Sequence, residues 1–266
     1  MANMKTVLIT GASSGIGRDI AIEFSKENFN FVLVSRRENL LVDLKNELLN
    51  NNPNISVDYF VCDLRKEPKD VYDYCVNKKI DVDVLINNAG LGDFSDFVDE
   101  DIDKINNMIE VNNKALVDLC YYFVKDFKRK KDGCIINVGS VASFVSGPHM
   151  AVYYVSKAFV LSFSLALRQE LKNDGIKVMC LCPGNTKTSF WEVAGSENSE
   201  YNIFQRSSKD VAKTCIKLYK TNKPYMIDGL MYKLMIVFVR LLPMNFASKL
   251  IGYIQADLKE KKWIKF

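Results

Sequence analysis

The sequence predicts an α/β protein with a doubly wound parallel sheet of about seven strands and helices on both faces. Short runs of almost continuously apolar residues recur along the chain, and amphipathic stretches of helical length separate them. Strands that are apolar on both faces are typical of parallel sheets covered on both sides. The 266 residues, 48% hydrophobic and 26% charged, are enough for one large core, and no linker or repeat interrupts the pattern.

Six apolar runs before residue 185 are expected to be strands, and each expected helix is longer and amphipathic. Because helices separate the strands, crossover connections make neighbouring strands parallel. The expected strands are residues 6–10, 31–35, 57–63, 82–88, 134–140 and 176–184. The expected helices are residues 15–27, 38–50, 66–79, 102–130, 152–172 and 208–222.

A strongly apolar segment lies near the C-terminus. Residues 230–242 carry charge only at Lys233 and Arg240, and Pro243 follows them. A spanning helix needs about 20 apolar residues, so we do not expect one here. A buried helix, a subunit contact and a cover over an apolar pocket all fit the segment. An interfacial membrane helix is the alternative, because the chain ends with Lys259, Lys261, Lys262, Trp263 and Lys265.

Charge gives no sign of a nucleic-acid partner. The net charge is +4, and the one dense basic run is residues 128–131. Nucleic-acid-binding domains usually gather their cations into a stripe. The basic run ends just before Gly133, so we interpret it as cations at a helix C-terminus that the glycine caps. We therefore expect no nucleic acid among the partners.

Cysteine and histidine usage argues against a disulfide framework and a metal site. The seven cysteines are scattered without a CxxC motif, and Cys180 and Cys182 share a strand, where they either alternate between faces or point alike. We interpret all seven as reduced, buried thiols, and the N-terminus has no signal-peptide pattern, so we expect a cytoplasmic protein. His149 is the single histidine and cannot build a multi-histidine site, so no metal is expected.

A glycine-rich segment links the first expected strand to the first expected helix. It reads TGASSGIG over residues 10–17, with glycine at 11, 15 and 17. Glycines let the backbone turn tightly and approach a pyrophosphate, and the helix N-terminus offers free N–H groups and a positive dipole. Ser13 and Ser14 can donate further hydrogen bonds. The strand–loop–helix setting favours a dinucleotide site over an ordinary glycine-rich turn.

The end of the second expected strand indicates which dinucleotide the loop binds. NAD-specific domains of this kind place an acidic residue there, which binds the ribose 2′-hydroxyl. Here the strand ends in Ser35-Arg36-Arg37, without an acid. A guanidinium matches a phosphate in a bidentate way, so the sequence predicts NADP(H), with NAD(H) as the alternative. An arginine that is only surface charge is the competing interpretation.

The stretch AVYYVSK, residues 151–157, places two phenols near one ammonium group. In a helix, Tyr153 stands four residues before Lys157 and Tyr154 stands three, so both can face it. A neighbouring ammonium favours the phenolate and lowers the pKa of a tyrosine from its usual value of about 10. The spacing predicts a catalytic Tyr–Lys pair, and spacing alone does not decide which tyrosine belongs to it.

Together these segments resemble the short-chain dehydrogenase/reductase family, in its compact single-domain branch. The resemblance is dense from residue 5 to about residue 190, and it implies a Rossmann-like fold and a homodimer or homotetramer. The apolar tail is similar to that of ketoacyl- and hydroxysteroid-type reductases. The matching motifs are TGASSGIG at 10–17, CDL at 62–64, NNAG at 87–90, Val111-Asn112, IINVGS at 135–140, Tyr153-x-x-x-Lys157 and PGNTKT at 183–188.

The resemblance implies a role for each matching residue. Tyr153 is the general acid or base, Lys157 lowers its pKa toward neutrality and holds the nicotinamide ribose, and Ser140 donates a hydrogen bond to the substrate carbonyl. Asn112 positions a water that links Lys157 to a proton relay. Tyr154 is expected to pack or to line an oligomer contact. The implied cofactor-binding residues are Gly11, Ser13, Ser14, Gly15, Ile16, Gly17, Arg36, Arg37, Asp63, Leu64, Asn88, Ala89, Gly90, Tyr153, Lys157, Pro183, Gly184, Thr186 and Thr188.

The expected organisation is one NAD(P)-binding domain, residues 1–227, and a C-terminal helical extension, residues 228–266, packed on it. The domain includes a substrate lid at about 189–207, whose Phe190 and Trp191 suit an apolar or bulky ketone. His149 is expected in a loop, solvated or, as the alternative, touching the substrate.

The sequence thus predicts an NADP(H)-dependent oxidoreductase that interconverts a ketone or aldehyde and an alcohol by hydride transfer. Ketoacyl, hydroxysteroid and general carbonyl substrates all remain open. A catalytically silent, cofactor-binding regulatory or scaffold protein on the same fold is the alternative function.

Overall fold

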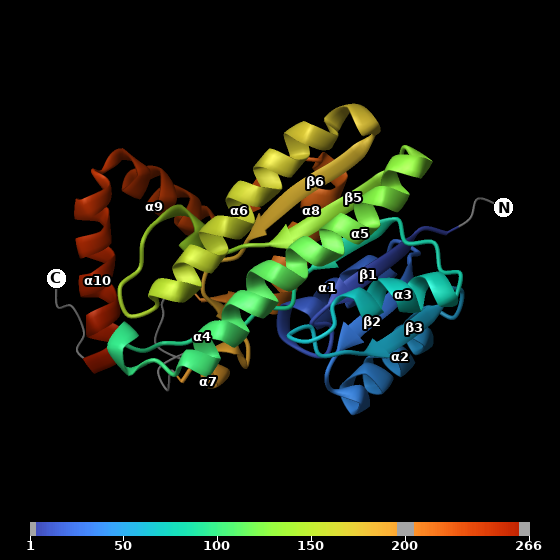
Figure 1. Ribbon diagram of the computed structural model, residues 1–266, viewed down its shortest axis with the longest axis horizontal. Coiled ribbons are helices and arrows are strands. Elements are labelled where there is room, and N and C mark those ends of the chain that lie inside the picture. The colour runs from blue at the N-terminus through green and yellow to red at the C-terminus, as the bar shows by residue number, and fades with distance from the viewer. Residues whose placement is uncertain (1–3, 196–204, 261–266) are drawn as a thin grey trace.

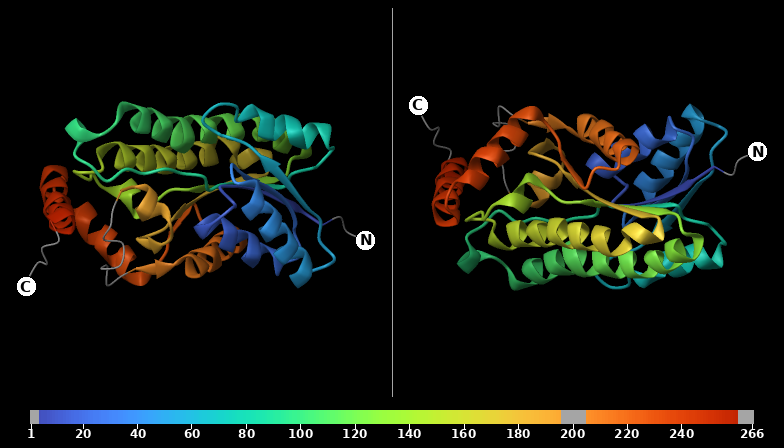
Figure 2. Two further views of the ribbon diagram at one scale, coloured as in Figure 1. Left: turned by 90° about the horizontal axis from the view of Figure 1, so that it is seen from below. Right: turned by 90° about the horizontal axis from the view of Figure 1, so that it is seen from above.

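The computed structural model describes residues 4–195 and 205–260 and shows a parallel sheet between two layers of helices (Figures 1 and 2). The sheet has seven strands in the order β3-β2-β1-β4-β5-β6-β9, and every neighbouring pair is parallel. The predicted doubly wound sheet is confirmed. The strands are β1 (Thr6–Thr10), β2 (Asn30–Ser35), β3 (Val57–Val61), β4 (Val84–Asn87), β5 (Gly133–Val138), β6 (Ile176–Cys182) and β9 (Tyr225–Ile227).

Helices cover both faces of the sheet (Figure 2). One face is covered by α1 (Gly15–Ser25), α2 (Glu38–Asn51) and α8 (Ser208–Thr221). On the other face lie α3 (Lys69–Asn77), α4 (Ile102–Ile109), α5 (Ala115–Lys130) and α6 (Ala151–Leu171). A turn of π-helix, Glu110–Lys114, joins α4 to α5 where the sequence predicts one helix over 102–130.

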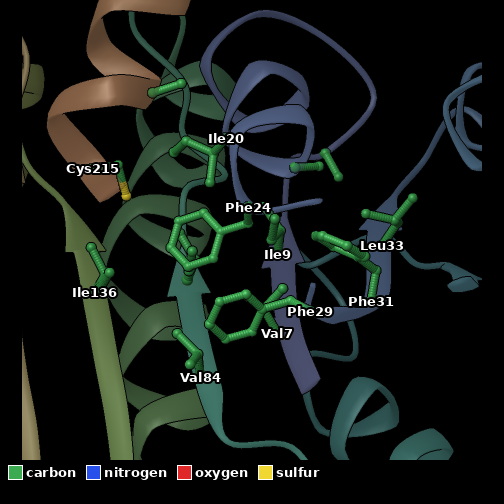
Figure 3. Close-up of a cluster of buried hydrophobic side chains, with 14 of the residues drawn as sticks. Val7, Ile9, Ile20, Phe24, Phe29, Phe31, Leu33, Val84, Ile136 and Cys215 are labelled. Atoms are coloured by element: carbon green, nitrogen blue, oxygen red, sulfur yellow. The ribbon is translucent and has the colours of Figure 1, made fainter. Parts of the chain in front are cut away.

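The central strands β1, β2, β4, β5 and β6 each serve two cores, which explains their nearly continuous apolar pattern. Val7 and Ile9 of β1 pack with Phe24 of α1 in the core shown in Figure 3. Leu8, between them, joins the opposite core with Phe123 of α5. If polar and apolar residues alternated along the strand, one face of the sheet would be polar, and the helices on that face would have no apolar surface to pack against.

Several predicted strands run too far at their carboxyl ends. The expected ranges 57–63, 82–88, 134–140 and 176–184 end in the structure at residues 61, 87, 138 and 182. The surplus residues leave the sheet and form loops. The seventh strand, β9, has only three residues, too few for a recognisable pattern. A second small sheet pairs β7 (Thr186–Lys187) with β8 (Arg206–Ser207), and between them lies α7 (Phe190–Val193).

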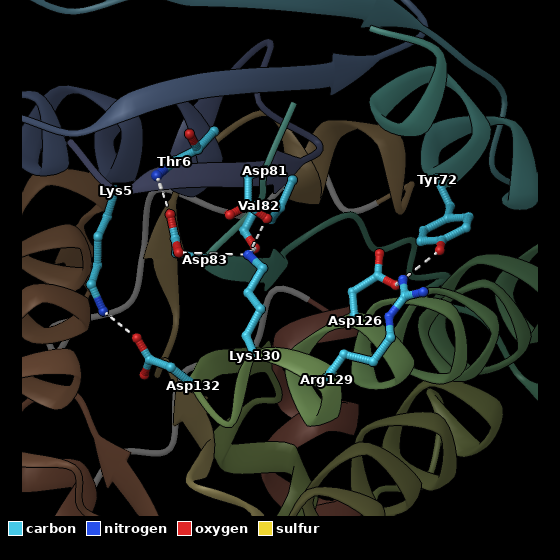
Figure 4. A network of polar contacts seen from close by, with 10 residues as sticks. All are labelled: Lys5, Thr6, Tyr72, Asp81, Val82, Asp83, Asp126, Arg129, Lys130 and Asp132. Atoms are coloured by element: carbon cyan, nitrogen blue, oxygen red, sulfur yellow. Dashed lines mark hydrogen bonds and ion pairs between the residues drawn. The ribbon is translucent and has the colours of Figure 1, made fainter. Parts of the chain in front are cut away.

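Polar contacts join the first residues of neighbouring strands, at the amino-terminal edge of the sheet (Figure 4). The backbone N–H of Thr6 donates to Asp83 Oδ2 at 2.8 Å, and Lys130 Nζ donates to the Val82 carbonyl at 2.9 Å. Lys130 also pairs with Asp81. A cation of the basic run therefore holds the starts of neighbouring elements, which is a structural role.

The cap of α5 differs from the prediction. The basic run does form the last turn of the helix, but Lys131 takes the left-handed conformation, with φ 55°. Gly133 instead begins β5, where a Cβ would lie 2.2 Å from Cγ of Phe127. The prediction of a glycine cap was wrong because close packing, and not a positive φ, requires glycine there.

Two helices, α9 (Leu230–Leu241) and α10 (Met244–Glu260), form the end of the molecule farthest from the N-terminus (Figure 1). Tyr232 and Ile236 of α9 join the core on the α5 and α6 face. Among the described residues, Ala151–Asp174 is the one helix long and apolar enough to cross a membrane by length and composition. This stretch is α6 with its following turn, and its Val160 and Ser164 are fully buried.

Candidate active site

The loops that leave the carboxyl ends of the strands converge on two adjoining cavities. Ligands of open α/β sheets bind at this edge, where the strand order reverses, and here that point lies between β1 and β4. The cavities measure about 300 Å³ and about 280 Å³. Both are lined by Ile16, Asn88, Gly90, Thr188 and Phe190, so the two spaces lie side by side.

The glycine loop forms one wall of the first cavity. Gly11 and Gly15 have φ of 65° and 55°, which favours glycine at both positions. A Cβ at Gly17 would lie 2.4 Å from Asn88 Nδ2 and from the Gly11 carbonyl oxygen. Ser14 is the N-cap of α1, and its side chain makes no capping bond. The first N–H groups of α1 are therefore available to an anion, as a pyrophosphate site requires.

Two arginines, Arg36 and Arg37, also line the first cavity. The Arg37 guanidinium donates to Ser13 Oγ at 2.9 Å and to Ser14 Oγ at 2.6 Å, so it lies across the glycine loop. Arg36 contributes to the low pKa of Asp63 through its charge, which places Arg36 on the Asp63 side. The first cavity thus has two cations in its wall, and both come from the turn between β2 and α2.

Asp63 is held as a carboxylate. Its hydrogen bonds with the Arg65 side chain, with Nε at 2.9 Å, are the main cause that lowers the pKa of Asp63 to about 2. Asp63 and the buried Leu64 both line the first cavity. At neutral pH Asp63 can therefore act toward a ligand only as a hydrogen-bond acceptor.

Asn112 is fixed in the π-helical turn by two elements. Its Nδ2 donates to Ser156 Oγ at 2.9 Å, and its Oδ1 accepts from the Leu91 backbone N–H at 2.8 Å. A Cβ at Gly90 would lie 3.4 Å from Asn112 Oδ1 and 3.2 Å from Lys157 Nζ. The amide oxygen and the ammonium therefore both border the space beside the Gly90 Cα, which a side chain at this position would fill.

Lys157 is buried in the wall of the second cavity, next to Gly90, which lines both cavities. Its Nζ donates to the Val138 carbonyl at 3.0 Å, at the end of β5. Its backbone carbonyl accepts from Ser143 Oγ at 2.7 Å, which ties α6 to the loop after β5. Burial lowers the pKa of Lys157 to about 8, because it disfavours the charged form.

Tyr153 faces Lys157 and Ser140. Lys157 Nζ lies 5.9 Å from the centre of the Tyr153 ring. Burial raises the pKa of Tyr153 to about 12, and a hydrogen bond with the Ser140 side chain acts in the opposite direction. The prediction that Lys157 lowers this pKa toward neutrality was wrong for the structure as it stands, because desolvation of the phenol dominates and burial also disfavours the charge on Lys157.

Tyr154 also lines the second cavity, but its hydroxyl is bonded within the chain. Its hydroxyl accepts from Gln255 Nε2 at 2.6 Å, and its ring lies against Gly147, where a Cβ would be 2.4 Å away. Burial raises its pKa well above the usual value. The rings of Tyr153 and Tyr154 are 6.1 Å apart at a steep angle, and their hydroxyls bond to different partners, Ser140 and Gln255.

The second cavity has a mainly apolar wall. Phe190 of α7 contacts Tyr153, with ring centres 5.4 Å apart. Trp191 Nε1 donates to Asn185 Oδ1 at 2.7 Å, and the Asn185 N–H donates to the Tyr232 hydroxyl at 3.1 Å. This chain of bonds joins the first part of the predicted lid to α9. The apolar lining also includes Met150, Met235, Ile236, Val239, Ile251 and Ile254.

The segment after β6, residues 183–190, forms a further wall of the two cavities and contacts the glycine loop. A Cβ at Gly184 would lie 2.1 Å from the Tyr232 ring, so only glycine fits there. Thr186 Oγ1 donates to the Gly184 carbonyl at 2.9 Å. A Cβ at Gly15 would lie 3.0 Å from Thr188 Cγ2, so Thr188 lies over the loop. The later part of the predicted lid, residues 196–204, lies outside the described residues.

The structure brings most of the predicted residues to the cavity walls. Ser13, Gly17 and Asn112 line neither cavity and support the walls from behind. The first cavity is lined by Gly11, Ser14, Gly15, Ile16, Arg36, Arg37, Asp63, Leu64, Asn88, Ala89, Gly90 and Thr188. The second is lined by Ser140, Tyr153, Lys157, Pro183, Gly184, Thr186 and Thr188.

Sequence reasoning missed several residues that position the site. They are Ser143 and Ser156, which hold Lys157 and Asn112, and Tyr232 and Gln255 from the C-terminal helices. A lone polar residue in an apolar stretch was the available signal for Gln255. Serine carries no comparable signal, because its role depends on which backbone group faces it.

Two further expectations concern single side chains. His149 is not simply solvated: its Nδ1 is bonded to Asp96 Oδ1, and its φ is 64°. All seven cysteines are free and buried, as predicted. Cys180 and Cys182 point alike, with their Sγ atoms 3.7 Å apart.

Comparisons with known proteins agree with this geometry. The sequence matches the short chain dehydrogenase family over residues 5–199. It is 29% identical over 215 residues to putative steroid dehydrogenase 4 of Caenorhabditis elegans, covering 79% of this chain and 80% of that protein. It is 32% identical over 175 residues to a very-long-chain 3-oxoacyl-CoA reductase of Laccaria bicolor, covering 64% of this chain and 52%, about half, of that protein.

A solved structure is also similar. A short-chain dehydrogenase from Sphingobium yanoikuyae in complex with NADPH shares 31% sequence identity and a TM-score of 0.79, covering 85% of this chain and 88% of that one. The predicted resemblance is thereby confirmed in sequence and in fold. The chain belongs to the short-chain dehydrogenase family of oxidoreductases.

Proposed function

We propose that the protein is an NADP(H)-dependent oxidoreductase that interconverts an apolar ketone or aldehyde and its alcohol, with Tyr153 as general acid or base. The observation that carries the proposal is the meeting of Tyr153, Ser140 and Lys157 in the second cavity, beside the glycine-loop cavity. Neither a turn serine nor a solvated lysine accounts for three such groups around one apolar space.

The first cavity fits a dinucleotide phosphate. Its glycines permit close backbone approach, the first N–H groups of α1 carry no side-chain cap, and Arg36 and Arg37 supply cations for a 2′-phosphate. The relative from Sphingobium yanoikuyae was solved with NADPH. When bound, the nicotinamide would supply or accept the hydride.

The chain's own residues would donate or accept the proton and would hydrogen-bond the substrate oxygen. Because burial raises the pKa of Tyr153 to about 12, the phenol is protonated at neutral pH, as a proton donor for carbonyl reduction must be. Ser140 would donate to the same substrate oxygen and stabilise developing negative charge. Lys157 would stabilise the phenolate that remains, and Asn112, over Gly90, would hold a water through which the proton is replaced.

The second cavity supports an apolar substrate. Its walls are mainly aromatic and aliphatic, and the polar side chains Asn185, Tyr232 and Gln255 in them are bonded within the chain. Relatives are named for steroid and long-chain 3-oxoacyl substrates. We therefore favour hydroxysteroid, ketoacyl or bulky carbonyl compounds over small diketones.

Replacing Arg36 and Arg37, singly and together, with alanine is expected to raise KM for NADPH by about tenfold or more. A lost charge-assisted bond to phosphate costs roughly 1.5–3 kcal/mol. KM for NADH should change by less than about twofold, because NADH lacks the 2′-phosphate. Initial rates with both cofactors at a saturating ketone give the ratio. Equal losses with NADPH and NADH would contradict phosphate recognition by the two arginines.

The proposed reaction is tested with the purified full chain and a panel of carbonyl compounds, by following NADPH oxidation. The panel contains steroid ketones, 3-oxoacyl thioesters, bulky ketones and small diketones. Turnover of an apolar ketone with preference for NADPH supports the proposal. Tight NADPH binding without turnover of any carbonyl would favour the silent cofactor-binding protein instead.

We also expect a homodimer or homotetramer, as is typical of the family. Val155 and Phe159 form an apolar strip on the outer face of α6, the helix that carries Tyr153 and Lys157. Covering such a strip is a common reason for self-association. Light scattering coupled to gel filtration measures the mass directly, and a monomer at micromolar concentration would contradict the expectation.

A further inference from the structure

The C-terminal helices carry the largest group of exposed apolar side chains in the described part of the chain. Over all the described residues, twenty large apolar side chains are exposed, and ten of these twenty lie between residues 230 and 253. These ten are Leu230, Met231, Leu234, Met235, Val237, Phe238, Leu241, Met244, Phe246 and Tyr253. An exposed group of this size, which we call the C-terminal apolar face, marks an interaction site.

Helix α9 has three distinct sides. Tyr232, Ile236 and Val239 are buried against the domain. Leu230, Leu234, Val237 and Leu241 repeat at helical spacing and form an exposed apolar stripe on another side. Lys233 and Arg240 stand seven residues apart, and therefore on the same side, between the buried side and the stripe. A helix that only covered a pocket would be polar on its outer side.

Charge has one sign in the part of this region that carries the exposed apolar side chains, whereas the last turn of α10 also contains Asp257 and Glu260. Between Gly229 and Ala256 the sequence contains Lys233, Arg240 and Lys249 and no acidic residue. All three cations are exposed. On α10, Lys249 lies between Phe246 and Tyr253 at spacings of three and four residues, so it shares their outer side.

We propose that the C-terminal apolar face binds peripherally to an anionic lipid surface. Exposed apolar stripes inserted at the headgroup boundary, flanked by lysine and arginine, are how interfacial helices bind membranes. A second copy of the chain fits less well. A two-fold contact through this face would bring the like charges of Lys233, Arg240 and Lys249 together without an acidic partner from the same segment.

The location of the face links it to the second cavity. Met235, Ile236 and Val239 of α9, and Ile251 and Ile254 of α10, line that cavity from inside. The two helices that would touch lipid are therefore also a wall of the substrate space. If the proposed function holds, an apolar substrate dissolved in lipid would reach the cavity beside these helices. The lipid binding itself does not depend on the proposed function.

The proposal is tested by flotation of the full chain with vesicles of phosphatidylcholine alone and with added phosphatidylglycerol. We expect the protein to float with the anionic vesicles and to be released by high salt, because surface attraction falls with ionic strength. Each cation changed to glutamine should weaken partitioning about fivefold. Recovery of all protein in the bottom fraction with anionic vesicles would overturn the proposal.

A matched pair of variants distinguishes vesicle binding through this face from non-specific adsorption of exposed apolar side chains. Val237 of α9 and Val76 of α3 are both helical and 62% and 53% exposed. Val237→Glu should lower vesicle binding at least tenfold, whereas Val76→Glu should leave it unchanged. Melting temperatures of both variants show that they are folded. If Val237→Glu lowers the oligomeric mass and vesicle binding is absent, the face contacts a second copy and the lipid proposal is wrong.

Ketone turnover by the same variants distinguishes this proposal from the proposed function. Val237→Glu should keep its rate with a soluble ketone, because the side chain points away from the cavity. A wild-type protein that floats but turns over no carbonyl would remove the proposed function and leave lipid binding intact.

Discussion

Tyr153→Phe is expected to lower kcat for carbonyl reduction by about 10³-fold, since a positioned acid contributes roughly 10²–10⁴-fold. The variant lacks only the hydroxyl that the structure directs toward Ser140. Its ring still packs on Phe190, so we expect NADPH to bind within about twofold of the wild-type Kd. Turnover from NADPH absorbance and binding from fluorescence titration measure the two quantities separately.

Tyr154→Phe is the matched control on the adjacent residue. It removes a hydrogen bond with Gln255 of α10, which costs about 1 kcal/mol of stability, and leaves the Tyr153 hydroxyl in place. Its kcat should change by less than about threefold. If the Tyr154 variant lost turnover and the Tyr153 variant kept it, the assignment of the acid on α6 would be reversed.

Lys157→Met is expected to abolish turnover and yet to stabilise the protein. Burial lowers the pKa of Lys157 from 10.5 to about 8, which corresponds to a cost of about 3 kcal/mol for holding the charge at neutral pH. The hydrogen bond to the Val138 carbonyl, worth about 1 kcal/mol, is lost in the variant. We therefore expect a net gain of about 2 kcal/mol in the free energy of unfolding.

The gain should disappear with rising pH. Below pH 8 both folded and unfolded wild-type chains carry the charge, so the cost of burying it is complete. Between about pH 8 and 10.5 the folded chain releases the proton while the unfolded chain keeps it, so wild-type stability rises toward that of the variant. Urea unfolding of both proteins at several pH values measures the difference.

An exposed lysine at the end of the same helix provides the control for net charge. Lys172 is the C-cap of α6 and is exposed, so Lys172→Met should change the free energy of unfolding by less than about 0.5 kcal/mol at any pH. A stability gain in Lys172→Met equal to that in Lys157→Met would mean that net charge, and not burial, is responsible.

The sequence was sufficient for the sheet and for the residues at its carboxyl edge. Strands buried on both faces are apolar throughout, and Gly11, Gly15 and Gly17 stand where backbone geometry allows no side chain. Both signals are local, so they can be found without a structure. Helical spacing placed Lys157 beside two tyrosines without deciding between them, and the resemblance to the family selected Tyr153.

Protonation and long-range contacts could not be predicted in the same way. The pKa values of Tyr153 and Lys157 depend on how deeply the folded chain buries them, and spacing along a helix does not encode burial. His149 meets Asp96, 53 residues away, and Gln255 meets Tyr154, 101 residues away. Such pairs form only where two loops or helices happen to pass each other in the completed fold.

The small sheet of β7 and β8 has a practical consequence for engineering. Thr186 pairs with Arg206, and Arg206 Nε is bonded to the buried Asp228 at 2.9 Å, so both ends of the intervening segment are anchored. Closure entropy grows slowly with length when the ends are fixed. Residues 191–205 can therefore be treated as a replaceable segment. Under the proposed function, grafts of other lengths should alter substrate choice, while Thr188 over the glycine loop and Phe190 against Tyr153 stay in place.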